Sequence, residues 1–77
     1  MKPLLVDLVS MLVSKPEAVA VEQFEEEDGT VVLELSVDDD DYGRVIGRGG
    51  RTANALRTIV KASAVREHKR VLLDIVD

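Results

Sequence analysis

The chain has 77 residues, which is enough for one small domain spanning residues 1–77. It has no cysteine, which excludes disulfide bonds and thiolate metal sites. The net charge of −5 is unevenly distributed: residues 1–41 carry 2 lysines and 12 acids (−10), whereas residues 42–77 carry 8 basic residues and 3 acids (+5). This asymmetry indicates a partner for the basic half.

The first segment, "MKPLLVDLVSMLVS", predicts an amphipathic helix that starts near Pro3 and ends at Lys15-Pro16. The positive start and apolar run resemble a signal peptide, but Asp7 interrupts the apolar region. The run is also too short to span a bilayer. We therefore expect a cytoplasmic protein that does not interact with a membrane.

Residues 18–24 and 30–37 alternate as strands do, and Asp28-Gly29 between them predicts a two-residue type I′ hairpin. In the second strand Val31, Leu33, Leu35 and Val37 share one face, which predicts a sheet with one buried face.

Four aspartates, Asp38 to Asp41, follow the hairpin. They form either a solvated loop or the capped start of a short helix that runs through Val45. The run lacks the ligand spacing and the distal glutamate of a calcium loop, which excludes that interpretation. The run could also restrict an anionic partner to the basic part of the surface.

A long helix is predicted over "RTANALRTIVKASAVRE", residues 51–67, ending near His68, with Ala53, Leu56, Ile59, Val60 and Ser63 at helical spacing. "RVLLDIV", residues 70–76, predicts a last strand. The order α-β-β-α-α-β predicts an α+β fold in which a three-stranded sheet has its helices packed on one face.

The most informative stretch is "RVIGRGGRTANALRTIV", residues 44–60. It does not match a phosphate-binding P-loop, because Val45 stands where the first glycine is required. It does not match a dinucleotide fingerprint either, because Thr52 stands where the third glycine is required.

Two interpretations of the glycines remain. The loop could be a structural turn between two helices, for which one glycine is sufficient. It could also be a backbone clamp, since Gly47 and Gly50 form a G-x-x-G whose missing Cβ atoms let a sugar-phosphate chain approach. Arg48, Arg51 and the start of the next helix would then bind phosphate.

These residues resemble the I-G-x-x-G core of KH domains, which bind single-stranded nucleic acid with this loop. The element order resembles the type II KH arrangement. The leading helix, "GRVIGRGGRTANALRTIV" and "KRVLLDIVD" are similar to the small stand-alone bacterial KH proteins of the KhpA family, over nearly the whole chain.

The resemblance implies a non-catalytic protein that binds single-stranded RNA, acts as an RNA chaperone or post-transcriptional regulator, and needs no cofactor or metal. It implies a KhpB-like KH partner and a role in cell elongation and envelope control. Gly49 departs from KH domains at large, which often have a polar residue there. The implied RNA-binding residues are Arg44, Val45, Ile46, Gly47, Arg48, Gly49, Gly50, Arg51, Thr52 and Arg57.

Other residues add no catalytic site. His68 has no partner that would make it a ligand or a base, and it is expected to be exposed. Phe24 and Tyr42 are more typical of core or edge positions than of base stacking. Because one KH unit binds about four nucleotides, self-association or pairing with another KH protein is expected to raise affinity. The alternative function is a KH-fold protein-interaction or dimerisation module that does not bind RNA.

Overall fold

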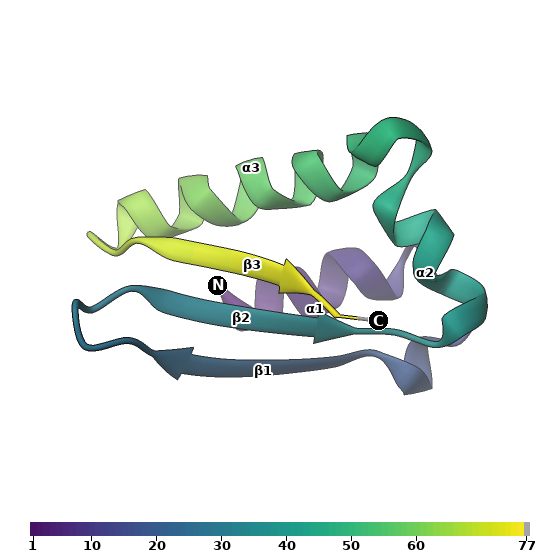
Figure 1. Cartoon of the computed structure of the whole chain (residues 1–77), viewed down its shortest axis with the longest axis horizontal. Helices are drawn as coiled ribbons and strands as arrows, with labels where there is room; N and C mark the ends of the chain where they lie inside the picture. Colours follow the sequence, from purple (N-terminus) through teal and green to yellow (C-terminus); the bar gives the residue numbers. More distant parts are fainter. Residues whose placement is uncertain (77) are drawn as a thin grey trace.

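The computed structural model describes residues 1–76, which form three α-helices and a three-stranded sheet in the predicted α-β-β-α-α-β order (Figure 1). Two single-turn 3₁₀ segments, η1 and η2, lie before β1 and before α3. The elements are α1 (Lys2–Ser10), η1 (Pro16–Ala18), β1 (Ala20–Glu25), β2 (Val31–Ser36), α2 (Asp39–Ile46), η2 (Arg48–Gly50), α3 (Arg51–Arg66) and β3 (Val71–Ile75).

The sheet order is β1-β2-β3, with β1 antiparallel and β3 parallel to the central strand β2. Helices α2 and α3 lie between β2 and β3 in the chain. They form the crossover that two parallel strands need. Figure 1 shows α1 behind the sheet and α3 along its β3 side. No helix of residues 1–76 lies across the opposite face of the sheet, which faces the viewer in Figure 1.

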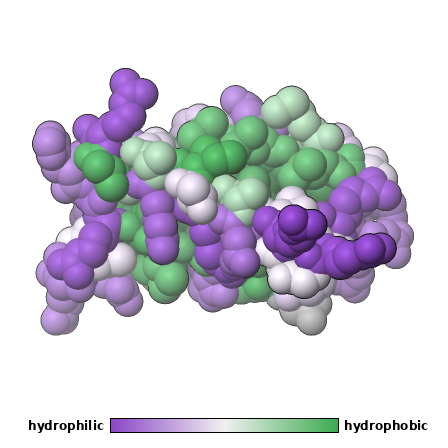
Figure 2. Space-filling model, turned by 90° about the horizontal axis from the view of Figure 1, so that it is seen from above, coloured by the Kyte–Doolittle hydropathy of each residue, from purple (hydrophilic) through white to green (hydrophobic). Residues whose placement is uncertain are grey.

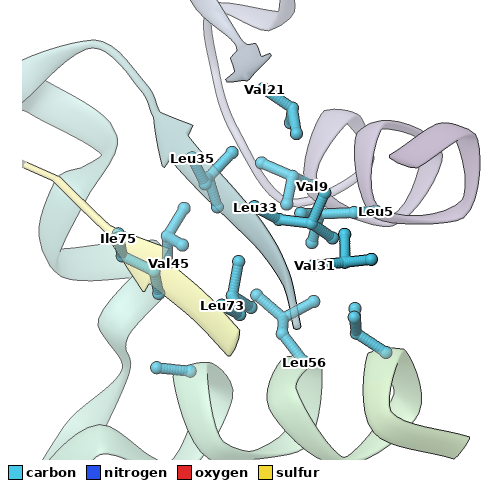
Figure 3. Packing of buried hydrophobic residues seen from close by; sticks show 12 residues of the cluster. Leu5, Val9, Val21, Val31, Leu33, Leu35, Val45, Leu56, Leu73 and Ile75 are labelled. Atoms are coloured by element: carbon cyan, nitrogen blue, oxygen red, sulfur yellow. The ribbon is translucent and has the colours of Figure 1, made fainter. Parts of the chain in front are cut away.

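The core lies between the helices and the covered face of the sheet (Figure 3). Leu33 and Leu35 of β2 are fully buried, and Leu5 of α1 and Leu56 of α3 pack against the same layer. The alternation predicted for β2 is confirmed for Val31, Leu33 and Leu35. The core consists of Leu5, Val9, Val21, Val31, Leu33, Leu35, Val45, Ala53, Leu56, Val60, Leu73 and Ile75.

Two predictions about the helices need correction. Helix α1 ends at Ser10 rather than at Lys15, because the chain leaves the helix through a turn at Met11 and Leu12. In α3 the buried stripe is Ala53, Leu56, Val60 and Ala64. Ile59 does not belong to it: this side chain is 41% exposed, since its position falls on the flank of the helix.

The turn between β1 and β2 also differs from the prediction. Gly29 N donates to Glu26 O and Glu26 N donates to Thr30 O, which makes a three-residue loop instead of a two-residue one. Gly29 has φ +90°, whereas Asp28 is not among the positive-φ residues of the described chain. This is a type I turn followed by a glycine bulge, in which only the glycine must be left-handed.

The aspartate run is a helix start, which confirms the capping alternative. Asp38 is the N-cap of α2, and its side chain accepts a hydrogen bond from Asp40 N at 3.0 Å. Exposed Lys15 lies 3.4 Å from the Asp38 carboxylate and 3.0 Å from that of Asp40. The carboxylates at the positive end of the helix therefore also hold the α1–β1 connection.

Asp41 is the only buried charged side chain among residues 1–76. Its carboxylate accepts bonds from Ser14 N and Ser14 Oγ, both at 2.9 Å, and from Lys15 N at 3.1 Å. These donors, chiefly the Ser14 amide, keep the pKa of Asp41 below its ordinary value of 3.8, against the opposing effect of burial. One carboxylate thus joins the chain after α1 to the start of α2.

We expect Asp41→Asn to lower the melting temperature by several degrees at pH 7, because an amide cannot accept all three bonds and places its own N–H groups beside donors. The pKa of Asp41 is depressed in the folded state, so its stabilisation is complete well above 3.8. It is lost as the pH falls below that value. The difference in melting temperature between wild type and variant should therefore shrink towards pH 3, as measured by circular dichroism.

Asp39→Asn is the matched control, since Asp39 lies in the same helical turn but is exposed. An equal loss of stability in the two variants at pH 7 would show that helix-dipole charge, rather than the buried contacts of Asp41, is responsible.

Candidate nucleic-acid interface

The loop from Gly47 to Gly50 joins α2 to α3 at the end of the molecule away from the β1–β2 turn (Figure 1). Gly47 N closes α2 by donating to Gly43 O at 2.8 Å, and Gly50 N donates to Gly47 O at 3.1 Å. Helix α3 then begins at Arg51, as predicted. The Arg51 amide donates to Arg48 O, and the N-terminal end of α3, where amides lack acceptors within the helix, faces this loop.

Three of the four loop residues have a backbone conformation that favours glycine. Gly47, Gly49 and Gly50 have φ values of +77°, +64° and +81°. A Cβ atom on Gly47 would lie 2.8 Å from Thr52 N, so the chain could not pass so close to the start of α3. A Cβ atom on Gly49 would meet nothing within 4 Å. Gly47 therefore has a structural role, whereas the space at Gly49 is open to a ligand.

The arginines of the loop are free to reach a ligand. Arg48 and Arg51 are exposed and form no salt bridge among residues 1–76. Arg44 is also exposed, on the last turn of α2, and lies 3.9 Å from the Asp41 carboxylate. Two of the three predicted cations near the loop are thus unneutralised.

Arg57 lies six residues beyond Arg51 along α3, nearly two helical turns, and is half-buried. Its Nε donates to Leu73 O of β3 at 3.4 Å, and one terminal nitrogen donates to Asn54 Oδ1 at 3.3 Å. These bonds direct the guanidinium along the side of α3 that faces β3. Arg57 therefore lies on the side of α3 next to β3, and not within the glycine loop itself.

Val45 is the one predicted contact residue that the structure removes from the surface. Its side chain is fully buried and belongs to the core, because it lies on the inward side of α2. Ile46 and Thr52 are partly exposed beside the glycines. Ile46 packs on the core while leaving part of its surface available, as expected for an apolar wall.

The two flanks of α3 differ in chemistry. The flank nearer β3 carries Asn54, Arg57, Thr58 and Lys61, and no acidic residue occurs from Tyr42 to Arg66. In Figure 2, which views the molecule from the α3 side, hydrophilic side chains lie along one part of the surface and a hydrophobic patch along another. Phosphate would be attracted to the flank of α3 that carries Arg57 and Lys61.

The hydrophobic patch corresponds to a groove of about 250 Å³ between α1 and α3. Met11 is 75% exposed and Ile59 41% exposed. The groove is lined by Leu8, Met11, Leu12, Thr52, Ala55, Leu56 and Ile59. Thr52 belongs both to this groove and to the glycine loop, so the two surfaces are neighbours.

Sequence reasoning missed two groups at the site, Asn54 and the Leu73 carbonyl. Asn54 precedes Arg57 by one helical turn, so its contact with Arg57 could have been found from that spacing. The Leu73 carbonyl could not, because its position depends on how β3 packs beside α3. Tyr42 is half-buried against the core, and His68, with φ +58°, is exposed as predicted.

The structure offers little else for chemistry. Residues 1–76 contain no group of three acidic, histidine or cysteine side chains placed to hold a metal ion. In the same part of the chain, none of the helices combines the length and apolar character needed to cross a membrane.

We expect Gly47→Ala to destabilise the fold more than Gly49→Ala. At Gly49, with φ +64° and ψ +19°, left-handed backbone costs a residue with a Cβ roughly 1–2 kcal/mol, whereas Gly47, with φ +77° and ψ +169°, lies in a region that is essentially restricted to glycine. Only the alanine at position 47 also collides with Thr52. Chemical denaturation of the two proteins measures the difference. Equal loss of stability would show that the Gly47–Thr52 approach can relax.

Comparison with known proteins agrees with this geometry. A family profile described as "KhpA/KhpB, KH domain" matches residues 2–75. The chain is 45% identical to the RNA-binding protein KhpA of Clostridium perfringens over 76 residues, covering 99% of this chain and 100% of that protein. It is 47% identical to the RNA-binding protein KhpA of Oceanobacillus iheyensis over 75 residues, covering 97% and 99%.

A solved structure shows the same fold at low sequence similarity. It is the protein Era in complex with MgGDPNP and nucleotides 1506–1542 of 16S ribosomal RNA. The match has a TM-score of 0.63 and 17% identity, and covers 92% of this chain and 27% of that one.

Proposed function

Because this chain belongs to the KhpA/KhpB family of KH domains, we propose that it binds single-stranded RNA without catalysing a reaction. The observation that carries the proposal is the Gly47–Gly50 loop at the start of α3, flanked by exposed Arg48 and Arg51. The relatives in Clostridium perfringens and Oceanobacillus iheyensis are named RNA-binding proteins, which supports it.

The loop binds the sugar-phosphate backbone. Open space at Gly49 lets the RNA chain approach the main chain, and the first-turn amides of α3 present their positive ends to a phosphate. Arg48 and Arg51 add charge-assisted hydrogen bonds on either side. Ile46 and Thr52 form the wall next to the bound chain.

The RNA then continues between α3 and β3. Arg57 is already oriented towards this side by Leu73 O and Asn54, so part of the entropy cost of ordering it has been met in the free protein. Its remaining guanidinium N–H groups donate to nothing else among residues 1–76. A single KH unit holds about four nucleotides, so binding is weak and tolerant of sequence.

Weak binding to short segments fits an RNA chaperone or post-transcriptional regulator in the cytoplasm, where a second KH domain of the KhpB type would add a linked site. Two linked sites raise affinity without any new contact to the RNA. We also propose a role in cell elongation and envelope control, which rests on the resemblance to the family alone.

Replacing Arg48 and Gly49 together by aspartate should abolish RNA binding and leave the fold intact. The substitutions put negative charge where phosphate lies, and a lost charge-assisted contact of about 1.5–3 kcal/mol gives at least a tenfold loss from Arg48 alone. Both positions are exposed, so little packing changes, and the left-handed backbone at position 49, which aspartate tolerates better than most residues, lowers the stability by about 1 kcal/mol. The measurement is a titration of labelled single-stranded RNA, beside a thermal melt.

The control is Lys2→Asp with Gln23→Asp, which changes the net charge by the same amount at exposed positions away from the loop. For the wild type, log K should fall with log salt at a slope near −2, from about three phosphates at about −0.7 each. A loop variant that melts normally and binds RNA as well as the wild type would show that the glycine loop is not the clamp.

A second candidate function is protein–protein association, which the apolar groove between α1 and α3 favours. Apolar surface of this kind, rimmed by polar side chains, is typical of interaction sites. A second copy of this chain could cover Met11 and Ile59 and place two glycine loops in one particle, because Thr52 lies at the rim of both surfaces.

Ile59→Glu should prevent self-association, since it introduces a charge into the groove, and Thr58→Glu on the adjacent exposed flank should not. Analytical ultracentrifugation over a range of concentrations measures the difference. A wild-type protein that remains monomeric at high concentration would remove this function, whereas RNA binding would still be tested separately by the loop variant.

A further inference from the structure

The face of the sheet that no helix covers has an ordered pattern of side chains. The strand register pairs Phe24 with Val32 and Val32 with Leu72, which gives an apolar row across all three strands. Phe24 is 47% and Leu72 53% exposed, while Val32 between them is 5% exposed. In Figure 1 this face is turned towards the viewer, in front of α1.

An acidic row lies beside the apolar row. Glu22 pairs with Glu34, and Glu34 with Asp74, so three carboxylates lie across the same face one pleat away from Phe24, Val32 and Leu72. Like charges placed directly opposite one another destabilise a sheet.

The protein itself does not neutralise this acidic row. None of its three carboxylates forms a salt bridge within residues 1–76, whereas nearby Glu25 is paired with Lys69 at 2.8 Å. A cation from a partner would remove the repulsion and would be attracted to all three carboxylates.

We propose that this outer sheet face is a docking surface for a basic amphipathic helix of a partner protein. The apolar row takes the leucines of that helix and the acidic row takes lysines or arginines along one flank. This inference is independent of the RNA-binding proposal, which concerns the opposite, basic part of the surface.

The dimensions of the two rows fit such a helix. The apolar row spans two strand spacings, about 9.6 Å. Helix residues i, i+4 and i+7 span about 10.5 Å, so a helix that lies across the strands presents three leucines to three strands. The acidic row is two residues away along each strand, about 6.7 Å, which is within reach of a lysine that leaves the side of the helix.

The charge of this face disfavours other occupants. RNA and an anionic lipid surface would both be repelled by the three carboxylates. A second copy stacked face to face would bring acidic rows together in addition to apolar ones. A positively charged protein segment is the occupant whose chemistry matches both rows.

The test uses two synthetic helical peptides with the same leucines at i, i+4 and i+7, one flanked by lysines and one by glutamates. Each is titrated into the ¹⁵N-labelled full chain and followed by NMR. The lysine peptide should shift amide signals of β1, β2 and β3 around Phe24, Val32 and Leu72, and leave those of residues 47–52 in place. The glutamate peptide should not bind.

Glu34→Lys reverses the charge at the centre of the acidic row and should weaken binding of the lysine peptide at least fivefold. The variant should bind the glutamate peptide more tightly than the wild type does, and its RNA binding should be unchanged. Glu27→Lys, in the exposed β1–β2 turn, is the charge-matched control and should bind the lysine peptide nearly as the wild type does. If Glu34→Lys does not fold, Glu22→Gln replaces it, with a smaller loss expected.

Three results would overturn the proposal. Equal binding of the two peptides would show that charge does not select the partner. Shifts confined to the α1–α3 groove or to the glycine loop would place the site elsewhere. If no amide signal of β1, β2 or β3 shifts at lysine-peptide concentrations up to about 1 mM, this face does not bind such a helix.

Discussion

The buried carboxylate of Asp41 is the contact that determines where the candidate site lies relative to the rest of the fold. This carboxylate accepts hydrogen bonds from the backbone amides of Ser14 and Lys15, which follow α1. Asp41 itself belongs to the first turn of α2. A carboxylate out of contact with water must keep its hydrogen-bond donors, because leaving it unpaired would cost far more than the bonds contribute. The segment after α1 and the start of α2 are therefore held together. The glycine loop, at the other end of α2, starts from a fixed position.

The loop depends in turn on the close approach of Gly47 to Thr52. With α2 held by Asp41 and α3 held against β3 by its apolar stripe, the chain has only four residues in which to reverse direction. Left-handed backbone at three glycines makes the reversal possible without strain. The same conformation leaves the main chain uncovered beside Arg48 and Arg51. The structural requirement and the proposed binding surface therefore coincide in this loop, and the two interpretations left open by the sequence do not exclude each other.

The charge distribution separates the surface into basic and acidic parts. The loop and the β3-facing flank of α3 are basic, whereas the β1–β2 turn and the outer sheet face are acidic. At physiological salt the Debye length is about 8 Å, so in a molecule 34 Å long each region acts mainly on the groups next to it. Under the proposed functions, the acidic regions would disfavour RNA and leave the outer sheet face available to a cationic partner.

The order of the elements, the start of α3 after Gly50 and the inward face of β2 were all determined by local patterns in the sequence: helical spacing, strand alternation and the glycines between them. The G-x-x-G loop and its arginines could also be identified from the sequence, because they are contiguous. Tertiary structure decided what depends on packing between distant segments. Val45 looked like part of the binding wall but is buried, since the side of α2 that faces the sheet follows from how Asp41 orients the helix. Ile59 matched the helical stripe yet lies on the exposed flank, and the outer rows of the sheet exist only once β3 pairs in parallel with β2. In each case neighbours far apart in the chain determine the outcome, and local periodicity contains no information about them.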